Sequence, residues 1–306
     1  MNRPLITVAI CTRNRAALLE KAMRSVLAQA NDRVELLVID NGSTDETAGV
    51  VERSAAADPR VKFFVEPETG LSRARNTALK NAKGEWVIFF DDDAEAEPGW
   101  LAAYEKFFAD PSRKQAAVVG GAVVPEYEIP PPKWMETEGG LELGPKPFCF
   151  KRGESPWECN CGYRRDAALQ VGGFDARLGH CGDAAGSREG ADLNIRLQDA
   201  GYEIWWLPGA SIRHLVHAGR LNLRWVLHAA FNKGRAVAIQ RLKYRVGSGA
   251  RRSYIAGRLL IAPFHCGINL LVALVGFPFQ NGRVTVTALT RAASIAGLAD
   301  GLLRQF

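Results

Sequence analysis

The chain has 306 residues, 47% of them hydrophobic and 24% charged, which excludes a disordered or fibrous chain and predicts one or two globular domains. Its net charge of +6 hides an asymmetry: residues 1–203 hold 25 basic and 32 acidic side chains, whereas residues 204–306 hold 14 basic side chains and one acid, Asp300. A basic C-terminal third indicates an anionic partner, either nucleic acid or anionic lipid.

The chain begins with a short apolar run, Leu5 to Cys11, that is too short for a signal peptide and lacks a cleavage region. The six cysteines are spread along the chain and include no CxxC pair. We therefore expect reduced thiols in the cytoplasm.

Strands and helices alternate through the first 90 residues. The predicted strands are Leu5–Ile10, Val34–Ile39, Val61–Val65 and Trp86–Phe90, and the predicted helices run from Asn14 to Gln29, from Ser43 or Thr44 to Ala57, and from Gly70 to Ala82. Such alternation predicts βαβ units and a parallel sheet. Because Cys11–Arg15 follows the first strand without a glycine, a dehydrogenase-type dinucleotide turn and a P-loop are both excluded.

Three carboxylates, Asp91 to Asp93, follow the most apolar of these strands, Trp86–Phe90. A short run of aromatic and β-branched residues is typical of a strand buried on both faces, and open α/β sheets bind ligands where such strands end. Adjacent carboxylates repel one another, and a divalent cation held between them and a substrate phosphate would offset that repulsion. The alternative is a solvated acidic turn.

The remaining segments are less regular. Residues 120–158 are rich in proline and glycine and predict a long irregular excursion. Asn222 to Arg245 has the pattern of a basic amphipathic helix. Leu259 to Gly282 holds 24 residues without a charge, which predicts a membrane span, a broken span, a re-entrant hairpin or an interfacial helix. Val284 to Leu303 predicts a second membrane-facing helix or a helix packed on the catalytic domain.

Five blocks in order resemble the family 2 glycosyltransferases of the GT-A fold, over about residues 5–214. They are ICTRNRAALLEKAMRSVLAQ, VELLVIDNGSTDET, GLSRARNTALKNAKGEWVIFFDDDAEAEPGWL, ECNCGYRRDAALQVGGFDARLG and REGADLNIRLQDAGYEIWWLPGASIRH. The resemblance implies an α/β GT-A fold, a Rossmann-like and mostly parallel sheet flanked by helices. It also implies inverting sugar transfer from a nucleotide diphosphate donor with Mg²⁺ or Mn²⁺.

The resemblance implies site residues position by position. The expected nucleotide-sugar site is Cys11, Thr12, Arg13, Asn14, Asp40, Asn41, Arg73, Asp91 and Asp92, and the expected metal ligands are Asp93, Asp91 and His214. Arg73 alternatively is a solvated helix arginine.

The catalytic base departs from the family pattern. The family places a Glu-Asp pair at the start of the helix near Glu189, and its aspartate is the base, but Gly190 stands at that position here. Inverting transfer needs a carboxylate to accept the acceptor's proton. We expect Glu189 in that role, then Asp192, and the alternative is a catalytically degenerate nucleotide-sugar-binding or scaffold protein.

The predicted organisation is a catalytic domain over 1–219, with a nucleotide-binding half 1–95 and an acceptor half 96–219, followed by a helical membrane-associating region over 220–306. Arg224-Trp225 lacks the preceding glutamine of processive synthases, so we expect addition of one hexosyl or N-acetylhexosaminyl unit. The expected donor is a UDP-sugar and the acceptor is lipid-linked or a saccharide. We expect the enzyme on an anionic membrane surface at its cytoplasmic face, with one or two C-terminal helices embedded. No nucleic-acid partner is expected, because the basic third lacks a recognisable module.

Overall fold

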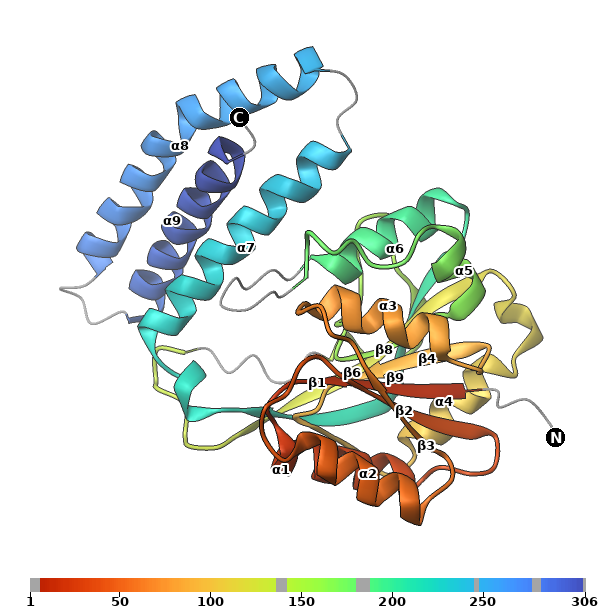
Figure 1. Ribbon diagram of the computed structural model, residues 1–306. Helices are drawn as coiled ribbons and strands as arrows, with labels where there is room; N and C mark the ends of the chain where they lie inside the picture. Colours follow the sequence, from red (N-terminus) through yellow and green to blue (C-terminus); the bar gives the residue numbers. More distant parts are fainter. Residues whose placement is uncertain (1–5, 136–141, 180–187, 245–247, 277–281, 305–306) are drawn as a thin grey trace. The chain divides into compact units, whose positions relative to one another are not determined.

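A computed structural model describes residues 6–135, 142–179, 188–244, 248–276 and 282–304 (Figure 1). The chain divides into two compact units. The first comprises Met1–Glu126, Gly139–Ala176 and Gly190–Leu215, and the second comprises Tyr127–Glu138, Arg177–Glu189 and Val216–Phe306.

The first unit is built on one mixed sheet with strand order β3-β2-β1-β4-β8-β6-β9-β5, and β7 pairs with β9. The strands are β1 Ile6–Thr12, β2 Val34–Asp40, β3 Val61–Val65, β4 Trp86–Phe90, β5 Ala94–Ala96, β6 Ala116–Tyr127, β7 Phe148–Cys149, β8 Asn160–Arg164 and β9 Glu203–Val216. Strands β1 to β4 pair in parallel, whereas β8 joins β4 antiparallel. The predicted parallel βαβ half is thus confirmed.

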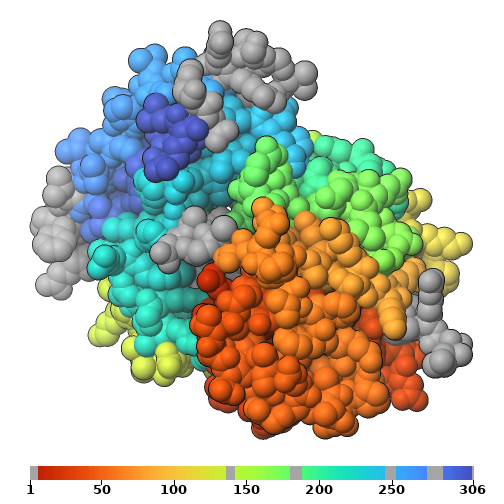
Figure 2. Space-filling model, viewed as in Figure 1, coloured from red at the N-terminus to blue at the C-terminus, as the bar shows by residue number. Residues whose placement is uncertain are grey.

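Helices cover both faces of this sheet (Figure 1). One face carries α1 Ala16–Leu27, α2 Thr47–Ala57 and α4 Trp100–Phe108, and the other carries α3 Leu71–Asn81, α5 Arg165–Gln170 and α6 Glu189–Asp199. Short 3₁₀ turns lie at Pro111–Arg113 and Ala218–Arg220. Apolar residues of β1 alternate between the two faces, because successive side chains of a strand point in opposite directions. Figure 2 shows the N-terminal part of this unit, coloured red to orange, as one continuous surface.

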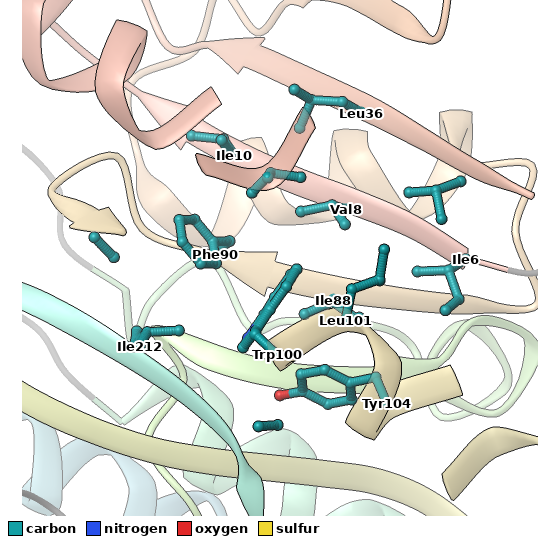
Figure 3. Packing of buried hydrophobic residues seen from close by; sticks show 14 of the residues in the cluster. Ile6, Val8, Ile10, Leu36, Ile88, Phe90, Trp100, Leu101, Tyr104 and Ile212 are labelled. Atoms are coloured by element: carbon teal, nitrogen blue, oxygen red, sulfur yellow. The ribbon is translucent and has the colours of Figure 1, made fainter. Parts of the chain in front are cut away.

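The larger cluster of buried side chains joins β1, β2 and β4 to α1 and α4. Figure 3 shows Trp100 and Tyr104 of α4 beneath the Ile88 and Phe90 side chains of β4. Trp100 packs edge-on against Phe90, with ring centroids 5.2 Å apart. Every residue of β4 is buried, as its unbroken apolar run predicts, so the strand's end is held in a fixed place.

Three expectations for loops and caps are wrong in detail. Asn14 does not cap α1, because it has a positive φ of 54° and α1 begins at Ala16. Neither Ser43 nor Thr44 caps α2, since Asp45 accepts the Thr47 N–H instead. The predicted irregular excursion starts later, because β6 continues as a strand to Tyr127.

The second unit contains three long helices, α7 Leu223–Lys243, α8 Ser248–Gly276 and α9 Gly282–Leu303. Asn222 caps α7 by accepting the Trp225 N–H. Helix α8 continues without a break through Pro263. Part of the predicted uncharged run, residues 277–281, lies outside the described residues.

Helices α7 and α9 pack with glycines at their contact. A Cβ added to Gly297 would overlap the Phe231 carbonyl oxygen and lie 2.6 Å from its carbon, and one on Gly234 would lie 2.7 Å from the Leu298 nitrogen. Beside this contact, Asp300 accepts a 3.0 Å ion pair from Arg235. The one acid of the basic third is therefore used to join the two helices.

Two helices of the described chain are long and apolar enough to cross a membrane, over Ser253–Ala273 and Thr285–Leu303. Only 11% of the first window is buried. Its exposed apolar side chains include Leu260, Phe264 and Leu271, with exposed fractions of 82%, 68% and 62%. Monomeric soluble proteins rarely expose contiguous apolar faces of this kind, so the exposed face of α8 is a candidate interaction surface.

Candidate active site

The candidate site lies where the parallel strands end. In the register of β1 and β2, Thr12 stands beside Asp40, and Asp91–Asp93 follow β4 directly. Thr12 Oγ1 donates a 2.7 Å hydrogen bond to Asp92 Oδ2. Residues separated by 80 positions in sequence therefore meet at one edge of the sheet, as the strand pattern predicts.

The loops after β1 and β2 are joined by side-chain hydrogen bonds. Asn14 Oδ1 accepts the Thr44 N–H at 2.7 Å, and Asp40 Oδ1 accepts the Ser43 N–H at 2.9 Å. The buried Asn41 amide donates to the carbonyls of Glu66 and Glu68 and accepts the Gly70 N–H. Asn41 thereby orders the loop that leads into α3, and its expected contact with a nucleotide base stays a prediction.

Arg15 bridges the second and third carboxylates of the triplet. Its Nη1 lies 2.8 Å from Asp92 Oδ1 and 2.8 Å from Asp93 Oδ2. Burial raises the pKa of Asp92 to about 6 even though the Arg15 charge opposes that rise. Arg15 therefore partly neutralises two carboxylates that repel each other. Sequence reasoning missed this residue, because it looks like an ordinary helix-start arginine.

His214 reaches the same carboxylates from β9. The register of β9 with β5 places it beside Ala94. Its Nε2 lies 3.1 Å from Asp93 Oδ1 and 3.5 Å from Asp91 Oδ2. Burial lowers the pKa of His214, but hydrogen bonds to Asp91 and Asp93 outweigh it and raise the pKa to about 10.

Cys159 completes a group of possible metal ligands. Ligand atoms of Asp91, Cys159 and His214 all lie within 4.8 Å of one another. The Asp91 N–H donates to the Cys159 carbonyl at 3.3 Å, which keeps the two residues together. Carboxylate, thiol and imidazole donors in one place fit a divalent cation. The expected ligands Asp91, Asp93 and His214 thus meet, whereas Cys159 was not foreseen.

Asn160, the first residue of β8, fixes the position of the preceding residue, Cys159. Its side-chain amide donates to the carbonyls of Ala122 and Ala210, and its oxygen accepts the Trp100 indole N–H at 2.8 Å. These bonds join β8 to β6, β9 and α4 in the buried interior. A fully satisfied buried network of this kind makes the position of the neighbouring Cys159 rigid.

The arginine that reaches the metal-ligand group is Arg75 rather than Arg73. Arg75 is 4% exposed, with Nη2 3.9 Å from Asp91 Oδ1, and its guanidinium lies over the Phe89 and Phe174 rings. Arg73 is 44% exposed and pairs with Glu68 at 2.6 Å. The two alternate along α3, so the sequence alone does not tell which one faces the site. The role expected of Arg73 at the diphosphate stays a prediction.

The two carboxylates expected as base lie on α6. Glu189 is 2% exposed, and Asp192 is fully buried. Asp192 Oδ2 accepts from Arg196 Nε at 2.9 Å, and Arg196 also donates to the Gly173 carbonyl at 2.6 Å. This geometry gives Asp192 a structural role, holding the turn after α5 against α6.

Comparisons with known proteins show which family this chain resembles. Residues 7–172 match the sequence model "Glycosyl transferase family 2". The chain is 26% identical over 267 residues to the "Glucosyl-dolichyl phosphate glucuronosyltransferase" of Haloferax volcanii, covering 84% of this chain and 83% of that protein. It is 28% identical over 302 residues to "Succinoglycan biosynthesis protein ExoM" of Rhizobium meliloti, covering 96% and 92%.

A solved structure shares the fold. The mannosyltransferase PcManGT from Pyrobaculum calidifontis, solved with GDP-Man and Mn²⁺, superposes with a TM-score of 0.61 at 19% identity, covering 97% of this chain and 88% of that one. The family match covers more than half of the chain and includes β1 to β4 and the carboxylate triplet. The chain is therefore a glycosyltransferase with the GT-A fold and belongs to glycosyl transferase family 2.

Proposed function

We propose that this protein transfers one sugar, with inversion, from a nucleoside-diphosphate sugar to a lipid-linked saccharide acceptor, and that it needs a divalent cation. The observation that carries the proposal is the meeting of Asp91, Asp93 and His214 at the carboxyl ends of the parallel strands. In open α/β sheets this edge is where ligands bind.

In this proposal Asp91, Asp93, His214 and Cys159 hold the cation, which supplies positive charge to the diphosphate as it leaves. Arg75, held beside Asp91 and over two aromatic rings, adds a second positive charge near that position. Thr12, Asp40 and Asp92 line the neighbouring edge and are assigned to the nucleoside with Cys11, Arg13 and Asn14. The thiol and imidazole favour Mn²⁺ over Mg²⁺, because Mg²⁺ prefers oxygen ligands alone.

The acceptor proposal is supported by a relative and by the second unit. The Haloferax volcanii relative is named for a dolichyl phosphate sugar. Helix α8 exposes an apolar face, and residues 204–306 carry 14 basic side chains. Apolar surface beside cationic residues binds anionic membranes, with about 1 kcal/mol per Lys or Arg close to the surface. We propose that residues 220–306 bring the enzyme to the cytoplasmic face of a membrane.

A catalytically degenerate protein of the same fold is the second candidate. It is favoured by one observation, that Gly190 replaces the carboxylate expected at the start of α6. Such a protein would bind nucleotide-sugar and metal without turnover.

The test uses the full-length protein in detergent micelles. Thermal unfolding is followed with UDP-glucose, UDP-glucuronic acid, UDP-N-acetylglucosamine and GDP-mannose, each with Mn²⁺ and with EDTA. Binding to the folded state raises the unfolding temperature, by more for a ligand of higher affinity. Release of UDP or GDP is then measured with short-chain polyprenyl phosphoglucose as acceptor. Equal stabilisation with EDTA would contradict the metal proposal, and binding without release would favour the degenerate alternative.

A further inference from the structure

Position 190 has no side chain because another carboxylate fills its place. A Cβ added to Gly190 would lie 2.5 Å or less from Cγ, Cδ and Oε1 of Glu158, whereas real Cβ atoms essentially never come within 3.0 Å of a neighbour. Glycine inside a helix costs about 1 kcal/mol relative to alanine. The space taken by Glu158 is a physical reason for glycine in the first turn of α6.

The Glu158 carboxylate lies close to where a carboxylate of residue 190 would lie. The Glu158 carboxyl carbon is 2.5 Å from the Cβ position of residue 190, and the carboxyl carbon of an aspartate would be about 1.5 Å from its own Cβ, one C–C bond away. Two such groups cannot occupy this volume together. A carboxylate can therefore reach this place either from an acidic residue at position 190 or, as in this chain, from Glu158 in a neighbouring segment.

Glu158 is also next to the group of metal-ligand candidates. It directly precedes Cys159, whose thiol lies within 4.8 Å of ligand atoms of Asp91 and His214. Glu158 is partly exposed, so a substrate can reach it. Glu189, by contrast, is almost fully buried, and Asp192 is fully buried and bound to Arg196.

We infer that Glu158 is the catalytic base of this enzyme and replaces the carboxylate that position 190 lacks. This inference rests on the proposed function. The acceptor hydroxyl forms a bond to the anomeric carbon while its proton passes to the Glu158 carboxylate. The bond from that carbon to the diphosphate breaks, and its electron pair leaves with the nucleoside diphosphate. With Glu158 in this role, the chain has a carboxylate to accept the proton despite Gly190.

The first experiment removes the base without changing its shape. Glu158→Gln is nearly isosteric, so affinity for UDP with Mn²⁺, measured by calorimetry, should stay within a few-fold of wild type. Release of UDP or GDP from the four donors, with polyprenyl phosphoglucose present, should fall by roughly 10²–10⁴. The matched control is Glu154→Gln, an exposed carboxylate in the same loop that accepts the Lys151 N–H, and it should retain full turnover.

The second experiment moves the carboxylate back to α6. Glu158→Ala vacates the space, and adding Gly190→Asp refills it from the helix. Turnover of the double variant should exceed that of Glu158→Ala by about tenfold or more, part of the 10²–10⁴ that a base supplies. If Glu158→Gln does not fold by circular dichroism, Gly190→Ala provides an independent measure, because its Cβ must displace Glu158 and lower turnover while UDP binding persists.

The outcomes separate this inference from the proposed function. Near-normal turnover of Glu158→Gln or of Gly190→Ala, or a double variant no better than Glu158→Ala, would overturn the assignment of Glu158 and leave the transferase proposal standing. Wild-type protein that binds UDP with Mn²⁺ but never releases product from any donor would overturn both.

Discussion

Binding of Mn²⁺ should release about two protons at neutral pH, because the His214 imidazole and the Cys159 thiol must each lose a proton to become a ligand. The imidazole lies 3.1 Å from Asp93 Oδ1 and 3.5 Å from Asp91 Oδ2. Burial disfavours its charged form, yet the hydrogen bonds to these carboxylates raise its pKa to about 10. Without metal, His214 is therefore protonated at pH 7, whereas a metal binds only the neutral ring.

The size of the effect of pH on Mn²⁺ affinity follows from the pKa of His214. At pH 7 the protonated ring outnumbers the neutral ring by about 1,000 to one, so protonation of His214 alone lowers metal affinity roughly 1,000-fold relative to high pH. The His214 contribution should raise affinity about tenfold for each pH unit between 7 and 9 and level off near pH 10, and loss of the Cys159 proton adds to this rise. The same shift stabilises the metal-free fold below pH 6.5, and this contribution is lost as the pH rises through 10.

Calorimetric titration of Mn²⁺ in buffers with different ionisation heats measures the protons released. We expect about two protons at pH 7.5 for wild type and about one for His214→Gln, in which only the Cys159 thiol still releases a proton. His228→Gln, in helix α7 of the second unit, is the control and should match wild type. A wild-type affinity that does not change between pH 7 and 9, or proton release as large in His214→Gln as in wild type, would refute the reasoning.

Three further results are expected. Asp192→Asn should lower the free energy of unfolding by about 1–3 kcal/mol in urea denaturation, because it leaves the partly buried Arg196 guanidinium without its charge partner; an effect well below about 1 kcal/mol would argue against a structural ion pair. Gly297→Ala should destabilise the second unit by about 1–3 kcal/mol, because its Cβ meets a backbone carbonyl of α7. Gly257→Ala has open space around its Cβ and should instead stabilise α8 by up to about 1 kcal/mol. Equal effects of the two substitutions would contradict the close packing of α7 and α9. Co²⁺ should give a thiolate-to-metal charge-transfer band that is lost in Cys159→Ser and kept in Cys149→Ser, and a wild-type spectrum without that band would remove the thiol from the ligand set.

The first four strands and their parallel pairing could be predicted because the signal of each strand is local. Unbroken apolar runs such as Val34–Ile39 and Trp86–Phe90 fit only strands buried on both faces, and the structure has strands at both places. Parallel pairing then brings their carboxyl ends to one edge. That step placed Asp91–Asp93 at the ligand-binding edge of the sheet, whereas Thr12 and Asp40 were assigned to the site by the resemblance to the family.

The partners of those carboxylates could not be predicted, because they depend on long-range side-chain directions. Arg15 and Arg75 sit in ordinary helical surroundings, and only the packing of α1 and α3 on the sheet turns their guanidinium groups toward the acids. Cys159 likewise has no recognisable ligand spacing in sequence. It reaches Asp91 and His214 because the Asn160 network fixes where β8 begins.

Gly190 shows how a departure from a family motif can be misinterpreted when only the sequence is seen. Along the chain, a glycine where a carboxylate is expected indicates lost catalysis. In the structure, the same glycine makes room for Glu158, a carboxylate 32 positions earlier in the sequence. If catalysis had simply been lost, nothing would require the vacated space to be filled by another acid beside the metal-ligand group, and an apolar side chain would fill it without the desolvation cost of a charge. The presence of Glu158 in this space is therefore a stronger indication of function than the absence of a carboxylate at position 190.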